Sequence, residues 1–357
     1  MTTRMLIMAG GTGGHVFPGL AVARVLQARG VSIDWLGANE GIESRLVPQA
    51  GLPLHCLDVR GVRGSGLKRK LAMPWMLLRS VLAARRLIRE LRPALVLGFG
   101  GFASGPGGLA ARLSGVPLVI HEQNARAGLT NRVLSRFATR VLEGFAGTFA
   151  ARGLATGNPV RAEIAALAVP EVRFAGRQGP LRILIIGGSQ GALALNRDLP
   201  ALLAEVFAGQ QIEVRHQSGK GREHEALDAW RATGIEVNVN EFIDDMAAAY
   251  EWADLLICRA GASTVAEVAA AGVAALFVPL PSAVDDHQSA NAHWLVERNA
   301  ARLLQQKDFN QAALAAALEG LFERAGQQAL ATRARECAIH DAAERVADIC
   351  MEVAHAG

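Results

Sequence analysis

Short runs of aliphatic residues alternate along the chain with longer stretches in which apolar residues recur at helical spacing. The short runs end in glycine, proline or polar turn residues. This alternation is typical of βα units around a parallel sheet, so the predicted fold class is α/β. The first half contains six predicted strands, at Met5–Ala9, Ile33–Leu36, Leu54–Asp58, Ala94–Leu97, Leu118–Ile120 and Arg140–Leu142. Helices are predicted between them, for instance over Pro18–Arg29.

The alternation starts a second time after a break. Five further strands are predicted at Arg182–Ile186, Glu213–His216, Glu236–Val239, Leu255–Cys258 and Ala275–Val278. Between the two series, prolines and glycines among charged residues predict an exposed linker at about 161–180. The stretch from Phe309 onward predicts helices only, and the last of these can pack on either domain. A chain of 357 residues is about twice a typical domain of ~150 residues, so we predict two domains.

Composition and charge narrow the class of protein. Hydrophobic residues make up 51% and charged residues 20% of the chain, which excludes a disordered scaffold. A net charge of +4, with 5% aromatic residues and one tyrosine, argues against a nucleic-acid partner. The four cysteines are too few and scattered for a disulfide framework or a zinc site, which fits a reducing compartment. Glycines interrupt both the N-terminal apolar run and the uncharged run Pro93–Ala111, so we expect no secretory signal, no transmembrane helix and a cytoplasmic location.

Glycine-rich loops follow three of the predicted strands. The first is Gly10–Gly14, the second is Gly187–Gly191 and the third is Gly98–Phe102. Such loops let the backbone approach a phosphate and direct N–H groups of the next helix towards it. Tight βα turns also need glycine for positive φ alone, which is the alternative for any single loop. Three loops together favour an anion-binding cleft lined by both domains.

Two common nucleotide motifs fit the glycine loops poorly. Gly11, Gly13 and the later Asp34 begin a dinucleotide fingerprint, but Val16 stands where the third glycine is required. Neither the first nor the second loop ends in the Gly-Lys-Ser/Thr of a Walker sequence. The sequence therefore disfavours a nicotinamide-dependent enzyme and an ATPase of the usual kind.

Eight stretches in matching order resemble a known family. They are GGTGGHVFPG at Gly10–Gly19, GFGGFASGPGGLAA at Gly98–Ala111, HEQNARAGLTNR at His121–Arg132, GNPVR at Gly157–Arg161, GGSQGA at Gly187–Ala192, HQSGK at His216–Lys220, EFIDDMAAAY at Glu241–Tyr250 and CRAGASTVAEVAAAG at Cys258–Gly272. Together they look like the N-acetylglucosaminyltransferases of glycosyltransferase family 28. The resemblance covers nearly the whole chain.

This resemblance implies a GT-B fold, with two Rossmann-like domains facing each other across a cleft. Residues 1–162 would bind the acceptor and face the membrane, with the helix at 341–357 packing back on them. Residues 163–340 would bind the sugar donor. The expected location is peripheral, on the cytoplasmic face of the cell membrane.

The implied reaction is inverting transfer of N-acetylglucosamine from UDP-N-acetylglucosamine to the C4 hydroxyl of the muramoyl sugar of lipid I, giving lipid II in peptidoglycan synthesis. Other proteins of cell-wall synthesis are possible partners. Another UDP-sugar enzyme of this fold, such as a glycolipid transferase or an epimerase, is the alternative. A UDP-sugar-binding protein without catalysis is the alternative from a different class.

The resemblance also assigns the donor site residue by residue. Ser189, Gln190 and Arg161 would hold the diphosphate, although a serine can simply cap a helix and an arginine can form a surface ion pair. Glu267 would accept hydrogen bonds from the ribose diol, or merely favour the helix dipole. The backbone of Ile243 would meet the uracil, and Gln288 the sugar hydroxyls, with His287 where the family often has glutamine. The remaining donor contacts are Thr12, Gly13, Gly14, Asn124, Ala262, Ser263, Thr264, Val265 and Ala266.

His15, at the start of the first helix, is the candidate general base for the acceptor hydroxyl. The alternative is that it only hydrogen-bonds a substrate oxygen or orders the loop. Glu122 is a further candidate for sugar or acceptor contacts. The acidic pairs Asp244–Asp245 and Asp285–Asp286 are adjacent rather than spaced as Asp-x-Asp. We therefore expect no metal and no other cofactor, with helix N-termini stabilising the leaving diphosphate.

The stretch 60–92 carries ten basic residues and one acid, Glu90, interleaved with apolar residues. Lys68, Arg69, Lys70 and Trp75 are the candidates for contact with an anionic membrane surface, which a lipid-linked acceptor requires. The alternative is a solvated helix whose other face lies in the core.

Overall fold

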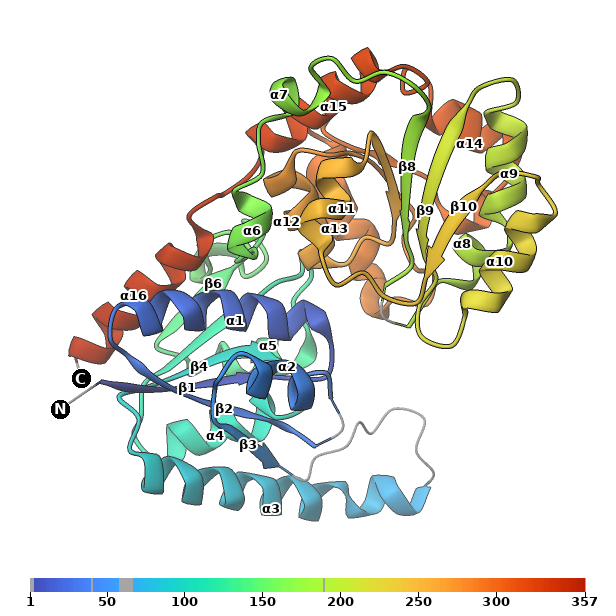
Figure 1. Cartoon of the computed structure of the whole chain (residues 1–357). Coiled ribbons are helices and arrows are strands. Elements are labelled where there is room, and N and C mark those ends of the chain that lie inside the picture. The colour runs from blue at the N-terminus through green and yellow to red at the C-terminus, as the bar shows by residue number, and fades with distance from the viewer. Residues whose placement is uncertain (1–2, 40, 58–66, 189, 357) are drawn as a thin grey trace. The chain divides into compact units, whose positions relative to one another are not determined.

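Two parallel sheets organise the chain, one in each of two units (Figure 1). The computed structural model describes residues 3–39, 41–57, 67–188 and 190–356, without the side chains of residues 67–73 and 284. The first unit comprises Met1–Arg161 and Asp341–Gly357, and the second comprises Ala162–His340. The predicted α/β class with two Rossmann-like domains is confirmed.

The first unit contains a seven-stranded parallel sheet in the order β3-β2-β1-β4-β5-β6-β7. Its strands are β1 Arg4–Ala9, β2 Ser32–Ala38, β3 Leu54–Leu57, β4 Leu95–Gly100, β5 Leu118–Glu122, β6 Arg140–Glu143 and β7 Leu154–Ala155. Its helices are α1 Gly13–Ala28, α2 Glu43–Gln49, α3 Leu67–Leu91, α4 Ser104–Leu113, α5 Leu129–Leu134, η1 Ala150–Arg152 and α16 Ala342–Ala356. The central strands are buried on both faces, which explains why they are continuous apolar runs in the sequence.

Helices cover both faces of this sheet. Met5 and Ile7 of β1 pack with α1, α2 and α16 on one face. Leu6 and Met8 point to the other face, where they pack with α3, α4 and α5. The helix α16 thus fills a layer of the first unit although it comes last in the chain (Figure 1).

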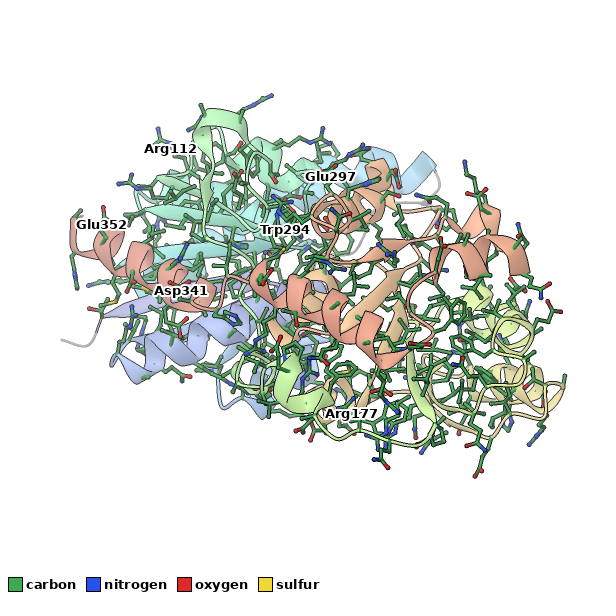
Figure 2. All side chains as sticks on the ribbon, turned by 90° about the horizontal axis from the view of Figure 1, so that it is seen from above. Arg112, Arg177, Trp294, Glu297, Asp341 and Glu352 are labelled. Atoms are coloured by element: carbon green, nitrogen blue, oxygen red, sulfur yellow. The ribbon has the colours of Figure 1, made fainter. Side chains whose placement is uncertain are left out.

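Ion pairs add to the packing of α16. The Arg29 guanidinium lies 2.7 Å from the Asp348 carboxylate. The Arg140 guanidinium of β6 lies 3.5 Å from the Glu352 carboxylate, which is labelled in Figure 2. Both pairs are exposed, so each contributes little beside the buried apolar face of the helix.

The second unit contains a six-stranded parallel sheet in the order β10-β9-β8-β11-β12-β13. Its strands are β8 Leu181–Ile186, β9 Ile212–Gln217, β10 Val237–Asn240, β11 Leu255–Cys258, β12 Ala274–Phe277 and β13 Arg302–Leu303. Its helices are α6 Ala162–Ala165, α7 Pro170–Phe174, α8 Leu193–Arg197, α9 Leu199–Val206, α10 Glu223–Arg231, α11 Met246–Trp252, α12 Ala262–Ala271, η2 Val284–Asp286, α13 His287–Val296, η3 Gln306–Asp308, α14 Gln311–Ala317 and α15 Arg324–Glu336. The helices α8, α9, α10 and α14 pack on one face of β8.

The first unit ends at Arg161, where the predicted linker at 161–180 begins, and most residues of this stretch are exposed or half-buried, as expected. Its helical structure was not predicted. This stretch forms α6 and α7, and Ile164 and Phe174 are buried. The buried Arg173 guanidinium donates to the carbonyl oxygens of Tyr250 (3.0 Å) and Ala271 (2.7 Å). Arg177, labelled in Figure 2, donates to the Asp254 carboxylate at 2.6 Å. Two of its charged side chains, Arg173 and Arg177, thus attach the stretch to the second unit.

Two element boundaries also differ from the prediction. The first helix begins at Gly13 rather than Pro18, which lies inside it without an N–H to donate. Burial of Val16 on the sheet extends the helix before the proline. The third glycine loop is shorter than predicted, because β4 continues to Gly100. The pairing of β4 with β1 skips from Gly98 to Gly100, so Phe99 is an extra residue in the ladder.

The close approach of two glycine loops in the first unit is sterically specific. A Cβ atom at Gly101, whose φ is +85°, would lie 2.3 Å from the carbonyl oxygen of Gly10. Gly115 has a similar φ of +71°, but a Cβ atom there would meet nothing within 4 Å. A comparison of Gly101 with Gly115 therefore separates the cost of a positive φ from the cost of a collision between the two loops.

We predict that Gly101→Ala lowers the free energy of unfolding of the first unit by about 3 kcal/mol, since strain and collision add. Gly115→Ala should lower it by only about 1 kcal/mol, the cost of a left-handed alanine. Hydrogen exchange of peptides from the first unit in the full chain, at increasing urea, measures both. Equal losses for the two variants would contradict the steric argument.

Candidate functional site

The strand order of each sheet reverses beside its first strand. In the first unit the reversal lies between β1 and β4, and in the second between β8 and β11. Loops that leave neighbouring strands in opposite directions at such a point leave room for a ligand at the carboxyl edge of the sheet. The predicted site residues Thr12–Gly14 follow β1, and Ala262–Glu267 follow β11. Each unit therefore carries predicted site residues at its own reversal point.

His15 lies in the first turn of α1, immediately after the first glycine loop. Its Nδ1 atom is 3.1 Å from the carbonyl oxygen of Gly10, which can only accept, so we assign the proton to Nδ1. Thr12 Oγ1 lies 3.3 Å from the same nitrogen. In the neutral ring the lone pair is then on Nε2, on the side of Gly100, where an added Cβ atom would be 3.2 Å away.

A buried carboxylate that the sequence analysis missed supports the first loop. Glu43 accepts hydrogen bonds from the backbone N–H of Gly11 (2.9 Å) and of Ala38 (3.0 Å). Added Cβ atoms at Gly10, Gly37 and Gly41 would all collide with its side chain. The only signal in the sequence is this set of glycines around an acidic residue, and it has no fixed spacing.

Both oxygens of the Glu122 carboxylate accept hydrogen bonds within the first unit. One of its oxygens accepts from the backbone N–H and from the side-chain amide of Asn124, both at 3.0 Å. The other accepts from Gly128 N (3.1 Å) and Asn131 Nδ2 (2.9 Å). This buried carboxylate thus fixes the segment from β5 to α5 and with it the predicted contact residue Asn124.

His121 is a neutral part of the same framework. Its Nε2 atom donates to the carbonyl oxygen of Gly157 at 2.9 Å, and Gln123 Nε2 lies 3.2 Å from Nδ1. Burial lowers the pKa of His121 from 6.5 to about 4. The ring therefore stays uncharged near neutral pH and joins β5 to the segment that leads to Arg161.

Arg161 is the last residue of the first unit, and its guanidinium stacks 4.8 Å from the ring centroid of Phe17 on α1. The same ring would meet a Cβ atom on Gly13 at 2.9 Å. The structure therefore brings Arg161 close to the first glycine loop. A guanidinium placed over an aromatic ring keeps its N–H groups directed outward, as anion binding requires.

The second glycine loop leaves β8 and is held by side chains from β9 and α10. Gln217 accepts from Gly188 N (2.9 Å) and donates to Gly188 O (3.0 Å). Arg222 Nε donates to the carbonyl oxygen of Gln190, whose side chain is exposed. A Cβ atom at Gly219 would lie 2.2 Å from Gly191 N, so this loop also depends on contact between two glycines. Ser189 lies outside the described residues.

A chain of buried hydrogen bonds lies behind this loop. Trp230 Nε1 donates to His216 Nδ1 at 2.9 Å, so the proton of the neutral ring is on Nε2, 3.1 Å from Asn196 Oδ1. Asn196 Nδ2 in turn donates to the carbonyl oxygen of Ser218 at 3.0 Å. Burial lowers the pKa of His216 from 6.5 to about 4, which keeps the chain uncharged. His216 ends a predicted strand and begins the HQSGK motif, whereas no local pattern in the sequence points to Trp230 or Asn196.

The helix α12 begins at Ala262, with Gly261 as its N-cap. Its first turn, with Ala262, Ser263 and Thr264, presents backbone N–H groups that suit an anion or a uridine carbonyl. Val265 is buried, so only its backbone can contact a ligand. Glu267 lies one turn further along, where its Oε2 accepts a hydrogen bond of 2.9 Å from the Tyr250 hydroxyl.

Gln288 and Ile243 are the two remaining predicted donor contacts of the second unit. Gln288, in the first turn of α13, accepts from Leu280 N (3.0 Å) and Ala260 N (3.3 Å), which ties the loops after β11 and β12 together. His287 precedes it and is half-buried. Ile243 is half-buried in the loop between β10 and α11. Both residues that we expect to contact the donor thus lie in segments that follow strands of the second sheet.

Neither a metal cluster nor a membrane-spanning helix is found where the structure describes the chain. No three His, Cys, Asp or Glu residues gather as metal ligands within the described ranges. Across the same residues, every helix is too short or too polar to cross a bilayer.

Comparison with protein families and solved structures gives consistent matches over both units. Residues 5–143 match the glycosyltransferase family 28 N-terminal domain, and residues 182–349 match its C-terminal domain. A crystal structure of MurG from Acinetobacter baumannii superposes with a TM-score of 0.83 at 43% identity, covering 98% of this chain and 99% of that one. This likeness supports the predicted GT-B fold class.

Two curated relatives match along nearly their whole length. The protein from Alcanivorax borkumensis is 60% identical over 356 residues, 99% of each chain. That from Aeromonas hydrophila is 55% identical over 357 residues, 99% of this chain and 98% of its own. Both are named UDP-N-acetylglucosamine–N-acetylmuramyl-(pentapeptide) pyrophosphoryl-undecaprenol N-acetylglucosamine transferase.

The two buried histidines predict a pH dependence of stability. An unfolded histidine takes up a proton below pH about 6.5, whereas folded His121 and His216 resist protonation until about pH 4. The stability from each is complete above pH about 6.5 and decreases as the pH falls towards 4, by up to about 3 kcal/mol. Urea unfolding at about pH 7.5 and about pH 5 measures the loss.

His216→Gln should reduce this pH dependence, because the group that takes up the proton on unfolding is removed. His224→Gln is the matched control, since His224 is exposed on α10. An unchanged pH dependence in His216→Gln would show that His216 is not held neutral by the fold.

Proposed function

The chain belongs to glycosyltransferase family 28, and we propose from this that it transfers N-acetylglucosamine from UDP-N-acetylglucosamine to the C4 hydroxyl of the muramoyl sugar of lipid I, giving lipid II. The observation that carries the proposal is the 60% identity, over 99% of both chains, to a transferase named for this reaction. The alternative of another UDP-sugar enzyme requires a different acceptor and is separated by the assay below.

The proposed roles of the residues are those that the family resemblance implies. The acceptor oxygen attacks the anomeric carbon as the bond to the diphosphate breaks, so the configuration at that carbon inverts. His15 takes the acceptor proton on Nε2, because Nδ1 already carries a proton that it donates to Gly10 O. Asn124 and the loop Thr12–Gly14 contact the sugars of donor and acceptor.

The departing UDP is the charged product, and stabilising it is the main electrostatic task. Arg161, the second glycine loop with Ser189 and Gln190, and the N-terminus of α12 supply positive charge and N–H donors for the diphosphate. Glu267 accepts from the ribose diol, Ile243 meets the uracil through its backbone, and Gln288 contacts the donor sugar. These groups suffice for leaving-group stabilisation without a bound metal.

The helix α3 is the proposed membrane contact. Val81, Ala84 and Ile88 pack into the core, yet Trp75 is 64% and Leu82 54% exposed. Core packing therefore accounts for one face of the helix and leaves a second apolar face. Exposed arginines on α3 add positive charge, and Leu113 on the neighbouring α4 is also exposed. Such a surface suits shallow insertion among anionic headgroups, on the cytoplasmic side where the nucleotide donor is available.

Lys68, Arg69 and Lys70 belong to the first turn of α3, and their side chains lie outside the described part of the structure. They extend the same basic segment in the sequence. Other proteins of cell-wall synthesis are proposed partners that would meet this protein at the same membrane surface.

We predict transfer of labelled N-acetylglucosamine from UDP-N-acetylglucosamine to a lipid I analogue in the presence of a metal chelator. Glu267→Ala should lower kcat/KM for the donor about 100-fold, by loss of hydrogen bonds to a charged group. His15→Gln should lower kcat about 100-fold or more, as expected for loss of a general base. Initial rates at varied donor and acceptor concentrations measure both.

The control for His15 is His55→Gln, because His55 pairs with Asp34 on the neighbouring strands and has no assigned role in the reaction. Activity that is lost with chelator and restored by magnesium would contradict the metal-free mechanism. Full kcat in His15→Gln would assign the base elsewhere. UDP-sugar binding without transfer to lipid I would favour another acceptor.

We also predict that Trp75→Ala combined with Lys68→Glu and Lys70→Glu weakens binding to anionic phospholipid vesicles about tenfold or more, since apolar insertion and electrostatic attraction are both reduced. Vesicle sedimentation measures the bound fraction. The matched control is Val172→Ala with Arg231→Glu and Lys307→Glu, which makes the same change of charge at exposed positions of the second unit. Equal binding by the two triple variants would rule out α3 as the membrane contact.

A further inference from the structure

The chain contains a single tyrosine, Tyr250, and its hydroxyl is buried. It lies on α11 with 1% of its surface exposed and donates a 2.9 Å hydrogen bond to Oε2 of Glu267 on α12. A buried phenol must find an acceptor, and a charged carboxylate is the strongest acceptor available to it. The bond therefore constrains both side chains.

Tyr250 is also held through its backbone. Its carbonyl oxygen accepts a hydrogen bond of 3.0 Å from Arg173 Nη1, and the same guanidinium donates to Ala271 O at the end of α12. Burial lowers the pKa of Arg173 to about 10, so the group remains a cation at neutral pH. Arg173 thus fixes α11 against α12, and the phenol has little freedom to leave the carboxylate.

The position of α11 connects two predicted contacts with the nucleoside. The helix starts directly after the loop that contains Ile243, and Asp245 caps it by accepting from Ala248 N at 2.9 Å. A displacement of Tyr250 would therefore affect both the loop proposed for uracil and the carboxylate proposed for ribose.

A glutamate side chain has three rotatable bonds, and ordering it on ligand binding costs free energy. A carboxylate already oriented by the phenol avoids that cost. A carboxylate oriented in this way also distinguishes a ribose that offers two hydroxyls from one that lacks the 2′-hydroxyl.

We propose that Tyr250 is a positioning residue that orients Glu267 towards the ribose diol and so sets the preference of the site for ribonucleotide over 2′-deoxyribonucleotide donors. This inference rests on the proposed function, in which Glu267 meets the ribose of UDP. Tyr250 itself does not contact the ligand. Its effect must therefore appear in ligand discrimination rather than in the chemistry of transfer.

The test is the affinity of the full chain for UDP and for 2′-deoxy-UDP, measured by calorimetry without acceptor. The wild type should bind UDP about tenfold or more tightly than 2′-deoxy-UDP, as expected for a hydrogen bond to a charged group. Tyr250→Phe should reduce this ratio at least about threefold, mainly by weakening UDP. In Glu267→Ala the ratio should approach one, and adding Tyr250→Phe should change it no further.

Thr233→Val is the matched control, because it also removes a hydroxyl from the second unit, at the end of α10. Its ratio should equal that of the wild type. Equal weakening of both ligands in Tyr250→Phe would mean that Tyr250 only stabilises the fold, which overturns the proposal. A wild type that binds UDP but does not discriminate overturns the ribose contact of Glu267, whereas one that does not bind UDP contradicts the proposed function itself.

The single tyrosine allows a second measurement on the intact protein if Tyr250→Phe does not fold. Biosynthetic replacement of tyrosine by 3-fluorotyrosine labels only position 250. Its fluorine resonance should move more with UDP than with 2′-deoxy-UDP, because only UDP offers the 2′-hydroxyl to the carboxylate that the phenol contacts. Equal movement with both ligands would overturn the proposal.

Discussion

The contact between glycine loops at the carboxyl edge of each sheet is the constraint on which the rest of the site depends. In the first unit Gly101 approaches the carbonyl oxygen of Gly10, and in the second Gly219 approaches the N–H of Gly191, so closely that any Cβ atom would collide. Neighbouring parallel strands bring the loops that follow them to the same edge of the sheet. Only glycine lets them meet there with their backbones turned to a ligand.

Buried polar side chains then hold these loops and other connecting segments of each unit. Glu43 and Glu122 accept backbone N–H groups in the first unit, and Gln217 brackets Gly188 in the second. His121 and His216 also hydrogen-bond to neighbouring segments, and both rings are neutral because burial lowers the pKa of each. A loop fixed by such groups loses little further entropy when it binds an anion, which is how a rigid framework contributes to affinity.

The sequence predicts the strands well because the central ones are buried on both faces and therefore appear as continuous apolar runs. The edge strands β7 and β13, of two residues each, carry no such run and were missed. The prolines, glycines and charges of 161–180 did not reveal that Arg173 is buried, because its three-dimensional partners are carbonyl oxygens about 80 to 100 residues away. Motif resemblance located Glu267 and His15, but Glu43, Trp230 and Asn196 act through distant contacts that no local spacing reveals.

The buried carboxylates show why residue type alone does not identify a ligand. Glu43 and Glu143 use both oxygens to accept backbone N–H groups, so each is committed to a loop of its own unit. Glu267 instead accepts from the side chain of Tyr250 on a neighbouring helix, one turn beyond a helix N-terminus. A backbone donor fixes an acid as part of the fold, whereas a side-chain donor orients it on a rigid helix. In the proposed function the phenol of Tyr250 orients the acid that meets the ribose, whereas Glu43 and Glu143 maintain loops.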